Sequence, residues 1–233
     1  MTLNKQALVA AISKFREDST TAVQFHDPDF TNSAITRRRH EGVMQARAEL
    51  LKALPAAPEA PKVNAQTVLA ARTLRTADQV AVAQQEFGIV ERLLAAGQPI
   101  EQIIHGASAA RLDAILAHAE VLPAVLGSAD PATVVAEVQA RVFDRLIETG
   151  DPQAVIARDA QAQYDQQAAW LEVVTDTIEG RQTGGGLTAL FHSDSEAFDA
   201  LMASNTDPVT NADTLATVAK LDRTFGVNAQ TGV

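Results

Sequence analysis

The chain has 233 residues, of which 44 are alanine, and its formal net charge at pH 7 is −10. It contains no cysteine, which excludes disulfides, thiol catalysis and zinc or iron–sulfur sites built from cysteine. A composition of 46% apolar and 21% charged residues is typical of a soluble globular protein, and no apolar run approaches the roughly 18 residues that a membrane span needs.

The charge is distributed unevenly along the sequence. Residues 1–75 carry 11 Lys and Arg against 7 Asp and Glu, whereas residues 76–233 carry 8 against 22. These counts give net charges of +4 and −14, which sum to −10. A basic N-terminal part beside an acidic remainder suggests a polar surface for protein partners, including other copies of the same chain. The alternative is that the acidity serves solubility alone.

A pair of helices is predicted at the N-terminus. Apolar residues recur at spacings of four and three over about residues 3–18. Asn32 or Ser33 can cap a second helix that reaches Leu54. The apolar stretch of residues 7–12 is short and leads directly into charged side chains, so a signal peptide is not expected.

Helix-start and helix-stop signals recur through the middle of the chain. The capping box Thr76–Gln79 can split the long helical pattern of residues 64–96. Gly97 is predicted to end that pattern in a left-handed conformation. Two Asp-Pro pairs, which begin at Asp130 and Asp151, each predict a helix start, because Asp caps a helix and Pro fits its first turn.

The C-terminal part is predicted to contain two further helices and an arm. Ser193 and Glu196 are expected to form a capping box for the first helix, and Asn211 is expected to cap the second. Residues 223–233 are polar and include two glycines, so this stretch is expected either to be disordered or to be ordered only by a partner.

Two segments rich in turn-forming residues divide the chain into parts. Three prolines predict an extended strap at residues 55–63, and a run of glycines predicts a hinge at residues 181–186. We therefore expect an N-terminal helical pair at 1–54, a central helical domain at 64–180, and C-terminal helices with a polar arm at 187–233.

The predicted fold class is all-α. No segment alternates convincingly between apolar and polar residues, whereas helix caps occur from end to end. The expected architecture is a multi-helix bundle of roughly eight to ten helices with extended terminal arms. With one Trp, one Tyr and eight Phe, such a chain is not expected to build a deep aromatic pocket.

No catalytic, cofactor or metal site is predicted. The glycines at 184–186 are followed by Leu187 and Thr188, without the lysine that a phosphate-binding loop needs. His26 and His192 each lie close to carboxylates in the sequence, but both clusters are also typical of turns and helix caps. The chain is therefore expected not to be an enzyme.

The sharpest local signal is the run Arg37, Arg38 and Arg39. Three adjacent arginines wrap around a helix, so they cannot share one face. Arginine binds both phosphate and carboxylate in two-pronged contacts. We interpret the run as a dock for an acidic protein surface or as a solvated helix start, in preference to a nucleic-acid site. Arg223 and Phe225, in the predicted arm, are the other expected partner-binding residues.

A stretch of the central part resembles known proteins. Residues 86–107 read Glu-Phe-Gly-Ile-Val-Glu-Arg-Leu-Leu-Ala-Ala-Gly-Gln-Pro-Ile-Glu-Gln-Ile-Ile-His-Gly-Ala, and residues 109–116 read Ala-Ala-Arg-Leu-Asp-Ala-Ile-Leu. Within roughly residues 65–120, this pattern is similar to Ala-rich helical head and neck assembly proteins of actinobacterial tailed phages. The resemblance carries no catalytic residues. It implies a virion component such as a helical, ring-forming head–tail connector or adaptor, with an arm that seats against a portal ring.

The expected function is therefore that of a non-enzymatic structural or assembly protein. Its expected partners are further copies of the chain, in a homo-oligomer or ring, together with portal and tail-completion proteins. It is expected in the virion or the host cytoplasm, with no membrane partner. A capsid scaffolding protein is the near alternative, and a nucleic-acid-binding regulator that uses Arg37–Arg39 is the alternative from another class.

Overall fold

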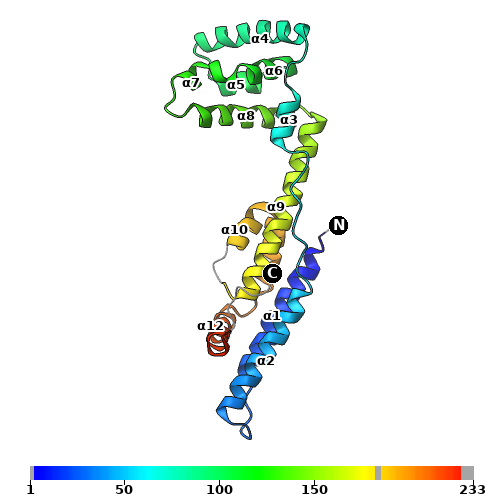
Figure 1. Cartoon of the computed structure of the whole chain (residues 1–233), viewed down its shortest axis with the longest axis vertical. Helices are drawn as coiled ribbons and strands as arrows, with labels where there is room; N and C mark the ends of the chain where they lie inside the picture. Colours follow the sequence, from blue (N-terminus) through cyan, green and yellow to red (C-terminus); the bar gives the residue numbers. More distant parts are fainter. Residues whose placement is uncertain (1–2, 182–184, 227–233) are drawn as a thin grey trace. The chain divides into compact units, whose positions relative to one another are not determined.

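The computed structural model describes residues 3–181 and 185–226, and these residues are almost entirely helical (Figure 1). They form twelve α-helices and one short 3-10 helix, with no β-strand in the described part of the chain. The predicted all-α class is confirmed. The helices outnumber the expected eight to ten because caps and prolines cut several of them down to between four and nine residues.

Two compact units make up the chain. The terminal unit contains Met1–Glu59 and Gln163–Val233, and the middle unit contains Ala60–Ala162. The boundary on the C-terminal side falls inside helix α9 (Pro152–Glu179). This division differs from the expected domains at 1–54, 64–180 and 187–233. The second half of α9 joins the two ends of the chain because its Trp170 is buried among residues of the N-terminal and C-terminal helices.

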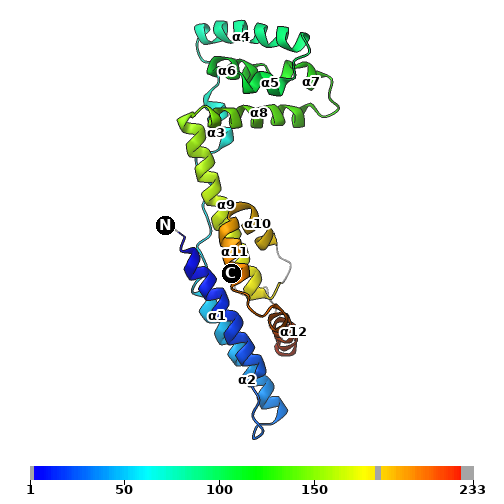
Figure 2. The same ribbon diagram turned by 180° about the vertical axis from the view of Figure 1, so that it is seen from behind.

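The middle unit is built in layers, which Figures 1 and 2 show from opposite sides. Helix α4 lies on one side, the short helices α5, α6 and α7 lie between, and α8 lies on the other side. Because each helix is amphipathic, stacking them buries one continuous core. The bounds are α3 (Ala65–Ala71), α4 (Ala77–Ala95), α5 (Ile100–His105), α6 (Ala109–Ala117), η1 (Ala119–Val121), α7 (Pro123–Leu126) and α8 (Pro131–Glu148).

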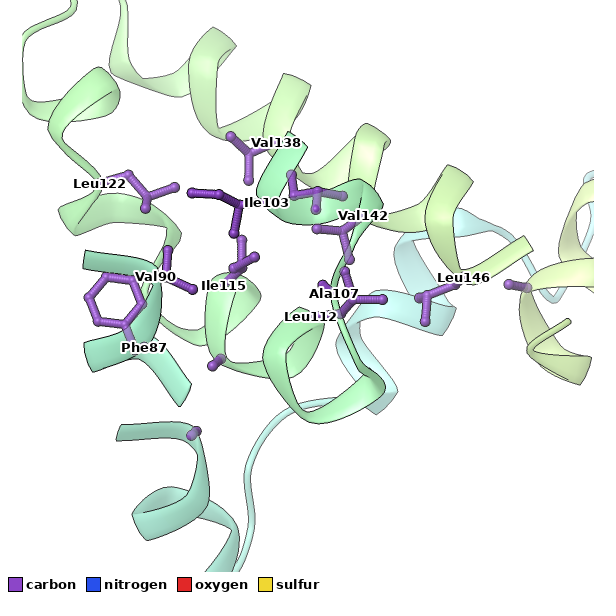
Figure 3. Packing of buried hydrophobic residues seen from close by; sticks show 14 of the residues in the cluster. Phe87, Val90, Ile103, Ala107, Leu112, Ile115, Leu122, Val138, Val142 and Leu146 are labelled. Carbon is purple, nitrogen blue, oxygen red and sulfur yellow. The ribbon is translucent and has the colours of Figure 1, made fainter. Parts of the chain in front are cut away.

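The core of the middle unit is aliphatic, with a single Phe among its buried side chains (Figure 3). Leu112 and Ile115 project from α6 into its centre, where they meet residues of the flanking layers. Phe87 and Val90 come from α4, and Val142 comes from α8. The burial of such side chains is the main favourable contribution to folding, at about 1.5–3 kcal/mol each.

The predicted helix signals in the middle unit are confirmed. Thr76 and Gln79 form a reciprocal capping box at the start of α4, and Gly97 follows that helix with a φ of 85°. Asp130 caps α8 with Pro131 in its first turn. The carboxylate of Asp151 accepts hydrogen bonds from the backbone N–H groups of Gln153 and Ala154 at the start of α9.

The terminal unit combines an N-terminal hairpin with helices from the C-terminal part. Helices α1 and α2 pack side by side along their length (Figure 1). Their buried side chains, including Leu8 and Ile12, pack with Trp170 of α9, Leu190 of α10 and Leu201 of α11. The bounds are α1 (Lys5–Gln24), α2 (Asn32–Leu51), α10 (Gly185–Ser193), α11 (Ser195–Ala203) and α12 (Pro208–Phe225).

Three expected caps lie at other residues in the terminal unit. Thr31, not Asn32 or Ser33, caps α2. Asp194, not Ser193, caps α11, because Ser193 still belongs to the preceding helix. Asp207, not Asn211, caps α12, and Pro208 occupies its first turn. This start is a third copy of the Asp-Pro device, so α12 begins earlier than expected.

The glycine run has a packing role beyond the hinge that the sequence suggested. Residues 182–184 of the expected hinge lie outside the described residues, whereas Gly185 and Gly186 form the start of α10. A Cβ atom on Gly186 would lie 2.7 Å from the backbone nitrogen of Val173. Only glycine therefore allows α10 to approach α9 so closely.

Candidate interaction surface where α12 meets α2

Helix α12 is fixed to α2 by a small core and a buried ion pair. Val43 of α2 is buried against Val218 and Leu221 of α12. Beside them, Arg47 donates hydrogen bonds of 2.8 and 2.6 Å to the two carboxylate oxygens of Asp222. These contacts hold the end of α12 against the middle of α2, although the two helices are far apart in the sequence.

An aromatic contact extends the same junction toward the surface. The imidazole of His40 stacks on the ring of Phe225, with centroids 4.3 Å apart and planes 20° apart. Phe225 keeps 40% of its surface exposed. The structure thus brings Phe225 beside the residue that follows the arginine run, and no sequence pattern indicates that these two expected binding segments meet.

The three arginines of the run have three different environments. Arg39 is half-buried and donates a hydrogen bond of 2.9 Å from its Nε to the backbone carbonyl of Phe25. Arg38 is exposed and lies 3.5 Å from Glu41, one turn ahead on the same helix. Arg37 is exposed and makes no ion pair or side-chain hydrogen bond with any other described residue. Arg39 is therefore a structural residue, and Arg37 and Arg38 remain accessible to a partner.

The first residues of the expected C-terminal arm belong to helix α12. Arg223 and Phe225 lie in the last turn of α12, and Gly226 follows that helix in a left-handed conformation. The Nε of Arg223 donates a hydrogen bond to the carbonyl of Ala219, while its side chain stays exposed. The rest of the expected arm, residues 227–233, lies outside the described residues.

Apolar groups are exposed next to these charges. Met44 is 38% exposed and Leu51 is 44% exposed. Met44 follows Arg37 by seven residues, and Leu51 follows Met44 by seven. Seven residues are about two helical turns, so the three side chains lie along one side of α2. We name the residues Arg37, Arg38, His40, Met44, Arg223 and Phe225, which lie on the two helices that meet here, the α2–α12 corner. Arginine, methionine and aromatic residues are the types enriched in protein interfaces.

The histidine and carboxylate clusters take the turn and cap roles that the sequence also allowed. Asp27 accepts a hydrogen bond from the backbone of Asp29 beside His26. Asp194 caps α11 and pairs with Lys5 at 2.6 Å. Among residues 3–181 and 185–226, no three His, Asp or Glu side chains converge in a way that could hold a metal ion. No helix within these ranges is both long enough and apolar enough to cross a membrane.

Comparisons with known proteins leave the surface without a precedent. No protein-family model, curated protein or solved structure matches this chain.

Proposed function

We propose that this chain is a non-enzymatic assembly protein that docks onto acidic protein surfaces through its α2–α12 corner. The specific form that we propose is a tailed-phage head–tail connector or adaptor, which the resemblance of residues 65–120 supports. In that form the chain assembles with further copies of itself, and the assembly contacts portal and tail-completion proteins.

The observation that supports docking is the unpaired guanidinium of Arg37 beside exposed apolar groups. Its charge is free to pair with a carboxylate, Met44 supplies apolar surface on the same side of α2, and Phe225 is exposed on the neighbouring helix. A buried core fixes α2 and α12 to each other, so the corner is pre-organised and little ordering entropy is lost on binding. Further copies of the chain, each with a net charge of −10, offer the acidic surface that such a corner needs.

Protein docking accounts for the corner better than nucleic-acid binding does. Arg39 is engaged with the carbonyl of Phe25, which leaves two accessible arginines in the run. Glu41 lies next to Arg38 and reduces its field. Nucleic-acid surfaces combine a broad basic face with aromatic rings on which bases stack, whereas one face of Phe225 is covered by His40.

Size-exclusion chromatography with light scattering tests the proposal. The full chain, of 24.7 kDa, is measured alone and with any portal and tail-completion proteins that its neighbouring genes encode. We expect a mass that is a multiple of the subunit mass, or a complex with one of these proteins. A mass of one subunit under every condition would contradict the proposal.

A second measurement distinguishes a connector from a scaffolding protein. Mass spectrometry of purified mature phage particles should detect the chain if it is a connector, because a connector stays in the particle. Its presence in immature particles alone would identify a scaffold. Its absence from both would reject a role in the particle.

A further inference from the structure

The middle unit contains a cavity that the proposed assembly role does not use. It has a volume of about 610 Å³ and lies between α4, α5, α7 and α8. This volume is within the range of small-molecule binding sites, about 300–1,000 Å³. The scarcity of aromatic residues argued against such a pocket, and no local sequence pattern indicates it, because five elements (α4, α5, η1, α7 and α8) supply its walls.

The walls of the cavity are apolar and rigid. Phe87, Leu122 and Val138 line it and also belong to the buried core of the unit (Figure 3). Because their other sides pack inside the core, these side chains cannot collapse into the cavity without opening a void elsewhere. Val121 also lines the cavity and is 52% exposed, so apolar surface continues to the mouth.

The lining of the cavity also contains the carboxylates of Glu91 and Glu137. On α4, Glu91 follows Phe87 by one turn, and on α8, Glu137 stands between Val134 and Val138. Neither Glu91 nor Glu137 makes an ion pair or hydrogen bond with another described residue. Both side chains are exposed, so two carboxylates without a partner among the described residues lie at the rim of the apolar cavity, one on α4 and one on α8.

The single basic side chain at the cavity does not neutralise them. Arg141 lines the cavity and pairs with Glu101, which lies on α5. Three glutamates and one arginine give the lining a net charge of −2. A cleft of one charge sign with low-dielectric walls concentrates its field and favours ligands of the opposite sign.

We propose that this cavity binds a small apolar amine, a molecule with an aliphatic or aromatic body and one protonated amino group. The body displaces water from the wall formed by Phe87, Leu122 and Val138. The ammonium group stays near the mouth, in the field of the Glu91 and Glu137 carboxylates. Anionic ligands with the same body are excluded by the same two carboxylates.

Three probes with one apolar body test this inference. They are n-octylamine, n-octanol and octanoate, which carry charges of +1, 0 and −1 at neutral pH. Each is titrated into the full chain while amide NMR signals from α4 and α8 are followed. We expect saturable shifts with octylamine, and affinity about tenfold weaker for octanol, which corresponds to one favourable charge contact. Octanoate should produce no saturable shift.

Matched variants locate the site. The double variant Glu91→Gln, Glu137→Gln should bind octylamine with the lower affinity that the parent has for octanol. Glu120→Gln is the control, because Glu120 is exposed in the same unit and does not line the cavity. Ala95→Trp places a large ring at the lining from an exposed position and should abolish binding of octylamine and octanol.

Two results would overturn the inference. Equal affinity for all three probes would show that the carboxylates do not select a cation. Binding that survives Ala95→Trp would place the site elsewhere. A failure of either kind leaves the proposed docking intact, because docking uses the α2–α12 corner in the terminal unit.

Discussion

Arg47 and Asp222 form a two-pronged ion pair that joins α2 to α12, with N–O distances of 2.8 and 2.6 Å. Their side chains are only 10% and 18% exposed. Bidentate charge-assisted hydrogen bonds are among the strongest polar contacts in proteins. The pair therefore sets the position of α12, and with it the position of Phe225 at the α2–α12 corner.

Removing one partner of this pair should destabilise the terminal unit strongly. Asp222→Ala leaves a buried guanidinium without a counter-charge, which costs about 3–5 kcal/mol. The urea midpoint, followed by fluorescence, checks this, because the only tryptophan of the chain, Trp170, is buried in the same unit. Glu41→Ala, which removes the exposed partner of Arg38, should leave the midpoint unchanged. If the urea midpoint of Asp222→Ala equals that of the parent, α12 is held by its apolar contacts alone.

Two glycine substitutions should have opposite effects on stability. In α2, a Cβ on Gly42 would lie 2.8 Å from the Cβ of Ala22, so Gly42→Ala should push α1 and α2 apart and cost about 1–3 kcal/mol. In α4, a Cβ on Gly88 would meet nothing within 4 Å. Gly88→Ala should stabilise that helix by about 0.5–1 kcal/mol. Thermal unfolding followed by circular dichroism measures both, and a gain in stability for Gly42→Ala would refute the close approach of the two helices.

Acid should weaken the middle unit through Asp151. Burial opposes the ionised form most strongly, but hydrogen bonds from the Ala154 N–H and from Arg72 outweigh it and lower the pKa of Asp151 below the ordinary value. The ionised carboxylate therefore stabilises the folded state at neutral pH. This stability is lost as the pH falls below the ordinary carboxyl pKa of about 3.9 and through the lower pKa of the folded state.

The variant Asp151→Asn isolates this contribution, because asparagine still caps a helix but carries no charge. Between pH 7 and pH 3, the urea midpoint of the parent, followed by circular dichroism, should fall further than that of the variant. Parallel curves for the two proteins would show that the charge of Asp151 adds no stability.

Local features of this fold were predictable from the sequence, because short-range chemistry determines them. The capping box at Thr76, the turn at Gly97 and the Asp-Pro start at Asp130 each depend on residues within about one turn of each other. Asp207 and Pro208 repeat the Asp-Pro pattern, so the start of α12 also depends on neighbouring residues, although Asn211 was the expected cap.

Contacts between distant residues could not be predicted in this way. Nothing near Arg47 in the sequence identifies Asp222 as its partner, and nothing near His40 identifies Phe225. The same limit applies to the role of Arg39, because an arginine that bonds a carbonyl and one that faces solvent look alike in a sequence. The cavity of the middle unit is the extreme case, since its lining comes from five elements.

Arg39→Ala should affect stability rather than assembly. Its loss removes the charge-assisted hydrogen bond to the carbonyl of Phe25, which is worth about 1.5–3 kcal/mol for a charged donor and less where water reaches the pair. The urea midpoint of the terminal unit should therefore fall, while the assembled mass at saturating protein concentration stays that of the parent. A variant with parental stability and reduced assembly would show that Arg39 contacts the partner after all.

The salt dependence of assembly tests the role of the α2–α12 corner most directly. Light scattering records the mass of the full chain from about 50 mM to about 500 mM salt, a range over which screening of exposed charges becomes strong. The assembled mass of the parent should fall as the salt concentration rises. The double variant Arg37→Ala, Arg38→Ala should have a lower mass than the parent at low salt and change little as salt is added. The control, Lys62→Ala with Arg75→Ala, removes the same charge from exposed positions outside the corner and should match the parent. Identical curves for the parent and the Arg37 and Arg38 variant would contradict docking through this surface.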